Sequence, residues 1–142
     1  MEKSSSTRHA LDINSRLKFM GKHPSDIDKK HTSLSSFYVY YLYEHRHPTN
    51  RMLHFVGTSG VIALLVLSIL WQHWILLAFT PLVGYGFAWI GHGLIERNKP
   101  ATFTYPLYSL AGDFIMYFHW VTGRLSGQLK AMEKHYGLSN ED

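Results

Sequence analysis

The chain of 142 residues has no cysteine, so disulfides and thiolate metal ligands are both excluded. It also lacks a glycine-rich phosphate-binding loop and the Gly-x-Ser-x-Gly sequence of a hydrolase nucleophile elbow. The Gly84-Tyr85-Gly86 sequence stands inside an apolar run with no preceding strand, so it does not indicate a cofactor motif. What remains is 10 histidines alongside carboxylates, a ligand set that favours iron, manganese or zinc.

Charge is missing from the middle of the chain, because no Asp, Glu, Lys or Arg occurs from Met52 to Ile95. A segment of this length without charge excludes an ordinary soluble surface. The formal net charge is +4, and the basic residues gather just outside the apolar stretches without forming a long run. This distribution indicates contact with lipid head groups rather than nucleic acid. We therefore expect the lipid bilayer as a partner.

Two apolar stretches predict a transmembrane hairpin. Met52–Trp71 and Trp74–Ile95 are each about twenty residues long, the length that a spanning helix needs. Trp71 and Trp74 flank a polar Gln72-His73 turn, as interfacial anchors do. Basic residues stand before the first stretch and after the second, at the end of the hairpin opposite the turn, so the positive-inside rule predicts that this end is in the cytoplasm.

The remaining segments predict further helices around the hairpin. Ser35-Ser36 offers an N-cap for an aromatic helix over Phe37–Tyr43, which we expect in the membrane interface. Phe103–Gly123 is apolar but interrupted by Pro106, Asp113 and His119, so the sequence leaves open whether it crosses or lies shallow. The predicted fold is all-α: an integral membrane helical bundle with a hairpin plus one or two further apolar or interfacial helices.

Three regions follow from this pattern. Residues 1–33 form a polar N-terminal extension with no apolar signal-peptide core, 34–127 a membrane-embedded helical domain, and 128–142 a polar helix and tail. A short helix is predicted over Leu11–Met20. The histidines of the extension have no ligand spacing, and we expect them to be solvated: His9, His23 and His31.

Four side chains near the cytoplasmic margin form a candidate metal site. His92 and Glu96 are spaced i, i+4, which places them on one face of a helix. Pro48 interrupts the helix between His45 and His54, so a bend there allows both imidazoles to converge. Imidazoles with a carboxylate are typical of non-haem iron sites. The alternative is that each side chain only bonds a neighbouring backbone or head group.

Several neighbours are candidates for supporting roles. Thr49 is the expected N-cap of the first span, which places Asn50, an orienting partner, on the face of His54. Three sets have two interpretations each. The cations Arg51, Arg97 and Lys99 bind either a substrate carboxylate or anionic lipid, and the aromatic residues Tyr41, Tyr85 and Trp89 either line an acyl groove or pack at the interface. Asp113 and His119 either join the site or form a polar pair between helices.

Two further histidines have one interpretation each. His47 is an alternative metal ligand, and His73, in the turn at the opposite end of the hairpin, is expected to be inert.

Two sequence patterns resemble a known family. From Phe37 the chain reads FYxxYLxEHxxxxNRxLHxxG, and from Gly84 it reads GYxxAWxGHxxxExNxPATFxYPxxSLxGD. Both are similar to small membrane proteins, formerly a domain of unknown function, that include a fungal 2-hydroxy-fatty-acid dioxygenase. The chain looks like the shorter bacterial branch of this family. The resemblance implies a bacterial inner-membrane enzyme whose metal ligands are His45, His54 and His92, with Glu96 beside them.

The function implied by the resemblance is the removal of one carbon from a 2-hydroxy long-chain fatty acid, with Fe(II) as cofactor and O2 as co-substrate. Among the four candidate residues, the expected arrangement is His54, His92 and one of His45 or Glu96 on iron, with the fourth behind them. A non-catalytic membrane protein that binds lipid or a partner is the alternative, with these side chains as structural contacts. A metal-dependent lipid hydrolase or hydroxylase is a third hypothesis.

Overall fold

The computed structural model describes residue 31 and residues 33–138, and within them every regular element is helical. The predicted all-α class is therefore confirmed for the described residues, whereas the helix predicted over Leu11–Met20 lies outside them, as do His9 and His23. In chain order the elements are α2 (Leu34–Glu44), α3 (Pro48–Leu70), the 3-10 segment η2 (Trp74–Phe79), α4 (Thr80–Ile90), the π-helical turn η3 (Gly91–Glu96), the 3-10 turn η4 (Ala101–Phe103), α5 (Pro106–Val121) and α6 (Leu125–His135).

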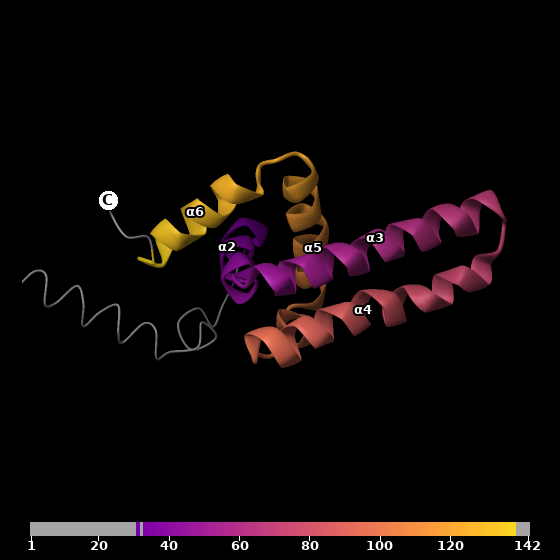
Figure 1. The fold of residues 1–142 in the computed structure, drawn as a ribbon, viewed down its shortest axis with the longest axis horizontal. Coiled ribbons are helices and arrows are strands. Elements are labelled where there is room, and N and C mark those ends of the chain that lie inside the picture. Colours follow the sequence, from indigo (N-terminus) through magenta and orange to yellow (C-terminus); the bar gives the residue numbers. More distant parts are fainter. Residues whose placement is uncertain (1–30, 32, 139–142) are drawn as a thin grey trace, which may run out of the picture.

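A long hairpin projects from the rest of the molecule, with α3 as one arm and η2, α4 and η3 as the other (Figure 1). Each arm, Pro48–Leu70 and Trp74–Glu96, has 23 residues and is apolar enough to cross a membrane. At 1.5 Å per residue each arm is about 35 Å long, which exceeds the ~30 Å hydrocarbon core of a bilayer. Trp71 and Trp74 are both 61% exposed at the turn, where the sequence predicts interfacial anchors.

The first arm begins earlier than the sequence suggested. His47, rather than Thr49, is the N-cap of α3, and its Nδ1 accepts a hydrogen bond from the Thr49 backbone N–H at 3.2 Å. Pro48 takes the first helical position, where its missing N–H costs nothing. The prediction of Thr49 as the cap was therefore wrong, because the proline starts the helix instead of only interrupting one.

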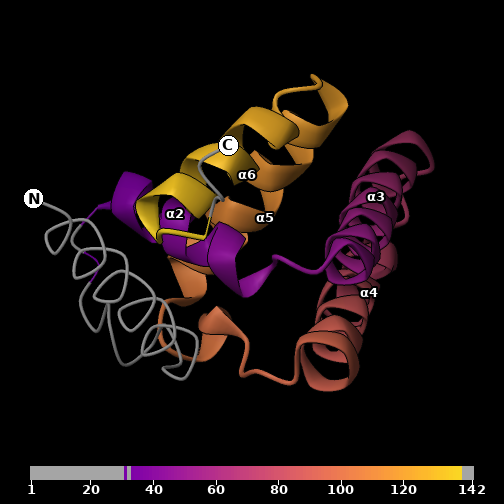
Figure 2. The same ribbon diagram turned by 60° about the vertical axis from the view of Figure 1, so that its left-hand side comes forward.

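Helix α2, which the sequence predicts at the membrane interface, forms a core with α5 and α6. These three helices gather at the end of the hairpin that holds the start of α3 (Figures 1 and 2). Phe37 and Tyr41 are almost completely buried in this core. His31 also packs against rings, with its centroid 4.8 Å from that of Tyr40, so its predicted solvation was wrong. The Ser33 Oγ caps α2, accepting from the Ser36 N–H at 3.3 Å, in place of the predicted Ser35-Ser36 cap.

The third apolar segment becomes α5, which has 16 residues and runs across the hairpin direction rather than along it (Figure 1). Apart from Trp120, its exposed large apolar side chains recur at helical spacing and form one stripe: Leu107, Leu110, Phe114, Phe118 and Val121. The following helix, α6, begins at Leu125, so the predicted region boundary between 127 and 128 falls inside it.

A tight contact joins the start of α3 to the end of the second arm. Asn50 is completely buried, and a Cβ atom built on Gly91 would lie 1.9 Å from the Asn50 Oδ1. No side chain fits at position 91 unless the buried Asn50 side chain is displaced. Gly93, two residues on, has open space at its Cβ position.

We predict that Gly91→Ala lowers the free energy of unfolding by about 1–3 kcal/mol, because the new methyl group overlaps the Asn50 amide. Thermal unfolding followed by circular dichroism in detergent measures this. Gly93→Ala is the matched control and should leave stability unchanged or raise it by up to about 1 kcal/mol, since alanine favours helix. Equal melting temperatures for the two variants would contradict the contact.

Candidate metal centre

Three histidines that are distant in the sequence meet where the hairpin joins the other helices. His45 is the C-cap of α2, His54 lies in the second turn of α3, and His92 lies in η3. All three are buried, and each offers a ring nitrogen within 4.8 Å of the other two. His45 Nε2 and His54 Nε2 lie 3.0 Å apart. The Pro48 bend therefore does bring the first two imidazoles together.

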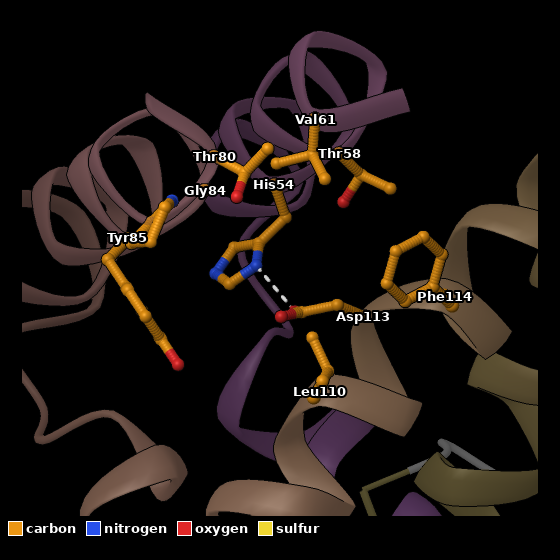
Figure 3. A pocket seen from close by; sticks show the side chains of 10 residues that line it. His54, Thr58, Val61, Thr80, Gly84, Tyr85, Leu110, Asp113 and Phe114 are labelled. Carbon is orange, nitrogen blue, oxygen red and sulfur yellow. Dashed lines mark hydrogen bonds and ion pairs between the residues drawn. The ribbon is translucent and has the colours of Figure 1, made fainter. Parts of the chain in front are cut away.

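The opposite nitrogen of each ring is held by an oxygen atom. His45 Nδ1 lies 2.6 Å from the Tyr41 carbonyl oxygen, and His92 Nδ1 lies 2.7 Å from the Asn98 Oδ1. His54 Nδ1 lies 2.9 Å from the Asp113 Oδ1, drawn as a dashed line in Figure 3. An oxygen that accepts a hydrogen bond requires the proton to be on Nδ1. The Nε2 atom of each ring then carries the lone pair, and those of His45 and His54 face each other.

This arrangement fits a transition-metal ion. Two facing Nε2 lone pairs repel each other, so the contact between His45 and His54 needs a cation or a proton between the two nitrogens. Imidazole nitrogens bind zinc-like ions at about 2.0–2.1 Å, so two ligands at right angles are about 3.0 Å apart. Burial lowers the pKa of His45, which keeps it in the neutral form that a metal ligand requires. Imidazole suits zinc, copper, iron and nickel alike.

Asp113 and Tyr41 support the centre from one side. The Asp113 Oδ1 also accepts a hydrogen bond from the Tyr41 hydroxyl, and the Tyr41 ring stacks on His45 with centroids 4.0 Å apart. Gly112 permits this approach, because a Cβ atom there would lie 2.8 Å from the Tyr41 ring. Burial and the neighbouring carboxylate raise the pKa of Tyr41, so it remains a neutral hydrogen-bond donor.

Asn98 supports the centre from the other side. Its amide nitrogen donates to the Glu44 Oε2 at 2.6 Å, so the same side chain links His92 to α2. Arg97 ends η3 in the left-handed conformation, with φ 54°, and this turn brings the Asn98 N–H to the His92 carbonyl at 3.0 Å. Burial raises the pKa of Glu44 to about 7.

The other predicted site residues are placed around the imidazoles in different ways. The Glu96 Oε1 accepts from the His47 N–H at 2.6 Å and is outside the group of three converging ligands. Asn50 packs against Gly91, and its amide atoms have no partner among the described residues. Arg51 donates to the His45 and Arg46 carbonyl oxygens at 2.9 and 2.6 Å. Their catalytic and substrate-binding roles stay predictions.

The predicted aromatic and basic residues separate into two surfaces. Tyr41, Tyr85 and Trp89 line a small cavity of about 30 Å³ among the three imidazoles. Arg97 and Lys99 instead line a different groove, together with Tyr40 and Phe103. The structure thus brings the aromatic residues to the centre and the two cations elsewhere.

Sequence reasoning missed Asn98 and Glu44, and it left open whether Asp113 joins the site or forms a polar pair with His119. The two do not pair: Asp113 bonds His54, whereas His119 Nδ1 lies 2.8 Å from the Tyr38 hydroxyl. A signal existed, because Glu44, Asn98 and Asp113 all stand in the quoted sequence patterns. His47, the alternative ligand, caps α3, and His73 lies exposed in the far turn.

We predict that the detergent-purified protein binds about one equivalent of a divalent transition metal, and that His45→Ala, His54→Ala and His92→Ala each abolish tight binding. Metal content after dialysis measures this. The matched control is His73→Ala, which removes an exposed imidazole and should bind like the parent protein. Equal metal content in all four variants would sink the metal interpretation.

We also predict that Asp113→Ala and Asn98→Ala weaken metal affinity by about 10- to 100-fold, because each removes the oxygen that orients a ligating imidazole. Competition with a chelator of known affinity measures the change. Glu96→Ala is the comparison, since its carboxylate bonds only the His47 backbone among the described contacts. A loss for Glu96→Ala greater than for the other two would place Glu96 on the metal.

Comparison with known proteins agrees with the sequence patterns. A protein-family model described as "2-hydroxy-palmitic acid dioxygenase Mpo1-like" matches residues 31–125. The match spans α2 to α5 and includes all three converging histidines. Comparisons with curated proteins and with solved structures found no significant match. Because the family model matches more than half of the chain, the protein belongs to the Mpo1-like family, as the resemblance in its sequence indicated.

Proposed function

We propose that this protein is a membrane-bound, Fe(II)-dependent dioxygenase that removes one carbon from 2-hydroxy long-chain fatty acids. The observation that carries the proposal is the set of three buried imidazoles whose Nδ1 atoms are all held by oxygen atoms. Membership of the Mpo1-like family supplies the class of reaction and of substrate.

The exposed apolar surface supports a location in the bilayer. Leu70, Leu82 and Leu94 on the hairpin are each at least 70% exposed, and only 11% of the most apolar part of the second arm is buried. Contiguous apolar surface of this extent requires a partner, and lipid is the partner that fits two arms of spanning length. The apolar stripe of α5 would then rest on the acyl region while α5 lies in the plane of the membrane.

Charge supports an orientation. Arg46, Arg51, Arg97 and Lys99 lie at the end of the hairpin that carries the histidines, whereas the Trp71–Trp74 turn has no charged residue. By the positive-inside rule, the proposed position of the histidines is near the cytoplasmic face, and the resemblance to the bacterial branch makes the bacterial inner membrane the proposed location.

Within the proposed centre, His45, His54 and His92 would hold the metal, and the Tyr41 carbonyl, Asp113 and Asn98 would hold the three rings. Iron(II), when bound, supplies the redox chemistry that activates O2. Three neutral imidazoles would not offset the positive charge of a bound metal ion, and this charge favours a substrate carboxylate beside the ion. The apolar walls of the small cavity, among them Ala88, Trp89 and Leu110, keep bulk water away from the reacting groups.

The overall reaction balances without an external reductant. A 2-hydroxy acid, R–CH(OH)–COOH, and one O2 give R–COOH, CO2 and H2O. The substrate loses four electrons and O2 gains four. A simple assay therefore needs only protein, iron, substrate and oxygen.

The alternative is a non-catalytic membrane protein in which the same side chains join the helices. The observation that favours it is that Asn98 and Asp113 each link two elements at the end of the hairpin. The two functions differ in the effect of removing the metal. The dioxygenase loses its activity without iron, whereas a structural cluster keeps its fold and its lipid contacts without any ion.

We predict that protein loaded anaerobically with Fe(II) consumes O2 when given a 2-hydroxy long-chain acid and releases the acid shortened by one carbon. An oxygen electrode and mass spectrometry of the products measure this. His92→Ala should lose at least about 100-fold in rate, since it removes a ligand, while His73→Ala should retain the parent rate.

Iron binding without turnover would retain the metal centre and direct the search to a hydrolase or hydroxylase substrate. Absence of iron binding, with His92→Ala indistinguishable from the parent protein, would favour the non-catalytic alternative.

A further inference from the structure

A second cavity, of about 210 Å³, opens beside the candidate metal centre between α3, α4 and α5. In Figure 3 a dashed line joins His54 to Asp113, and the other lining side chains come from the same three helices. α3 contributes Thr58 and Val61, and α5 contributes Phe114. Apart from His54 and Asp113, the walls carry no titratable carboxylate or imidazole, so the cavity suits a chain of methylene groups.

The apolar cavity continues into the small cavity among the imidazoles. Tyr85, Leu110, His54 and Asp113 line both of them. A molecule that fills both cavities therefore has one end beside the three imidazoles and the other among apolar side chains. This is the shape of an amphiphile with a polar head and a long tail.

The head-group end has an unused hydrogen-bond donor. Ser109 lines the small cavity and is only 6% exposed, and its hydroxyl has no hydrogen-bond partner among the described residues. It stands four residues before Asp113 on α5, so both side chains lie on the face that meets the histidines. A buried hydroxyl without a partner is costly, which indicates a ligand group that completes it.

No lysine or arginine lines either cavity. Arg51 is engaged with backbone carbonyl oxygens, and Arg97 and Lys99 line another groove. An uncharged donor must therefore bind the acid head group from the protein side.

We propose that the two cavities together form the acyl-binding channel of this protein, with Ser109 as the residue that donates a hydrogen bond to the carboxylate of the fatty acid. The tail lies between α3, α4 and α5, along Thr58 and Val61 of α3. The identity of the acid as the reacting substrate rests on the proposed function, whereas the position of its tail does not.

The direction of the channel agrees with how an amphiphile lies in a bilayer. From His54 to Val61 the cavity follows α3 for seven residues, about 10 Å, toward the turn of the hairpin. The tail therefore points toward the bilayer interior while the head stays at the margin that carries the basic residues. The rest of a long chain leaves sideways into lipid, so the substrate need not be extracted from the membrane.

The first test is photo-crosslinking of the metal-free and the Fe(II)-loaded protein, both kept anaerobic. The probe is a long-chain 2-hydroxy acid with a diazirine at mid-chain. Peptide mapping should place the label on the walls of the channel, at Thr58–Val61 of α3, Thr80–Gly84 of α4 or Leu110–Phe114 of α5. Labels confined to the exposed opposite face of α3, at Met52, Val56 or Leu70, would overturn the channel.

The second test shortens the channel. Val61→Phe should raise the Kd for a long-chain 2-hydroxy acid by about tenfold and leave that for a medium-chain acid unchanged, because the new ring blocks the distal end. The matched control is Val66→Phe on the outer face of the same helix, where the side chain is 47% exposed. Equal chain-length profiles in the two variants would contradict the position of the tail.

The third test concerns the head group. In the Fe(II)-loaded anaerobic protein, Ser109→Ala should raise the Kd for the acid by about tenfold and change that for the matching 1,2-diol much less. Ser68→Ala is the control, since Ser68 is buried at the other end of the hairpin and its hydroxyl donates to the Leu65 carbonyl oxygen at 2.8 Å. An equal effect on acid and diol, or none on either, would remove Ser109 from head-group binding.

These outcomes separate the two proposals. Crosslinks in the channel without any O2 uptake would keep the acyl site and reject the dioxygenase. If His92→Ala lowers the turnover rate but Val61→Phe leaves the chain-length dependence of the Kd unchanged, the dioxygenase proposal stands and the channel is rejected.

Discussion

The hydrogen bonds at the three histidine Nδ1 atoms are the constraint on which the candidate centre depends. An imidazole turns about two single bonds, so its Nε2 has a fixed direction only when the rest of the ring is held. The three acceptors come from different parts of the chain: a backbone carbonyl in α2, a carboxylate in α5 and an amide just after η3. The centre therefore forms only when the hairpin, α2 and α5 are packed together, so the geometry of the three ligands depends on the tertiary structure.

The same hydrogen bonds also matter for the fold, because the proposed surroundings of the hairpin are lipid rather than water. Between helices in lipid, burial of apolar surface provides little driving force, since acyl chains are as apolar as leucine. Close backbone approach helps along the hairpin, where a Cβ atom on Gly57 would lie 3.2 Å from the Phe87 Cβ. At the junction with α2 and α5 the polar links take over this role. The metal-centre and the structural interpretations therefore predict the same contacts between helices. They differ in what lies between the two Nε2 atoms 3.0 Å apart: a metal cation in the first and a proton in the second.

The sequence predicted the parts of the structure that depend on local patterns. Hydropathy identified the two arms of the hairpin, and the Pro48 bend correctly indicated that His45 and His54 converge. It did not predict the direction of α5 or the burial of α2, because both depend on packing between distant segments. Nor could spacing reveal that Asn98 and Asp113 orient the rings: the bond from Asp113 to His54 spans 59 residues. Glu96 illustrates the limit of i, i+4 arguments, since the turn that carries it is π-helical and its carboxylate bonds the α2–α3 linker.

Charge explains why the proposed channel has a serine rather than an arginine at its head-group end. A guanidinium buried beside Asp113 would pair with that carboxylate, which already bonds His54 and Tyr41. It would also repel a metal cation held by the histidines. With neutral imidazoles and a neutral hydroxyl, the positive charge that attracts the acid comes from the metal alone. On the proposed function, binding of the acid head group is then coupled to occupation of the centre, and the protein holds its substrate in the reactive position only when the ion that acts on it is present.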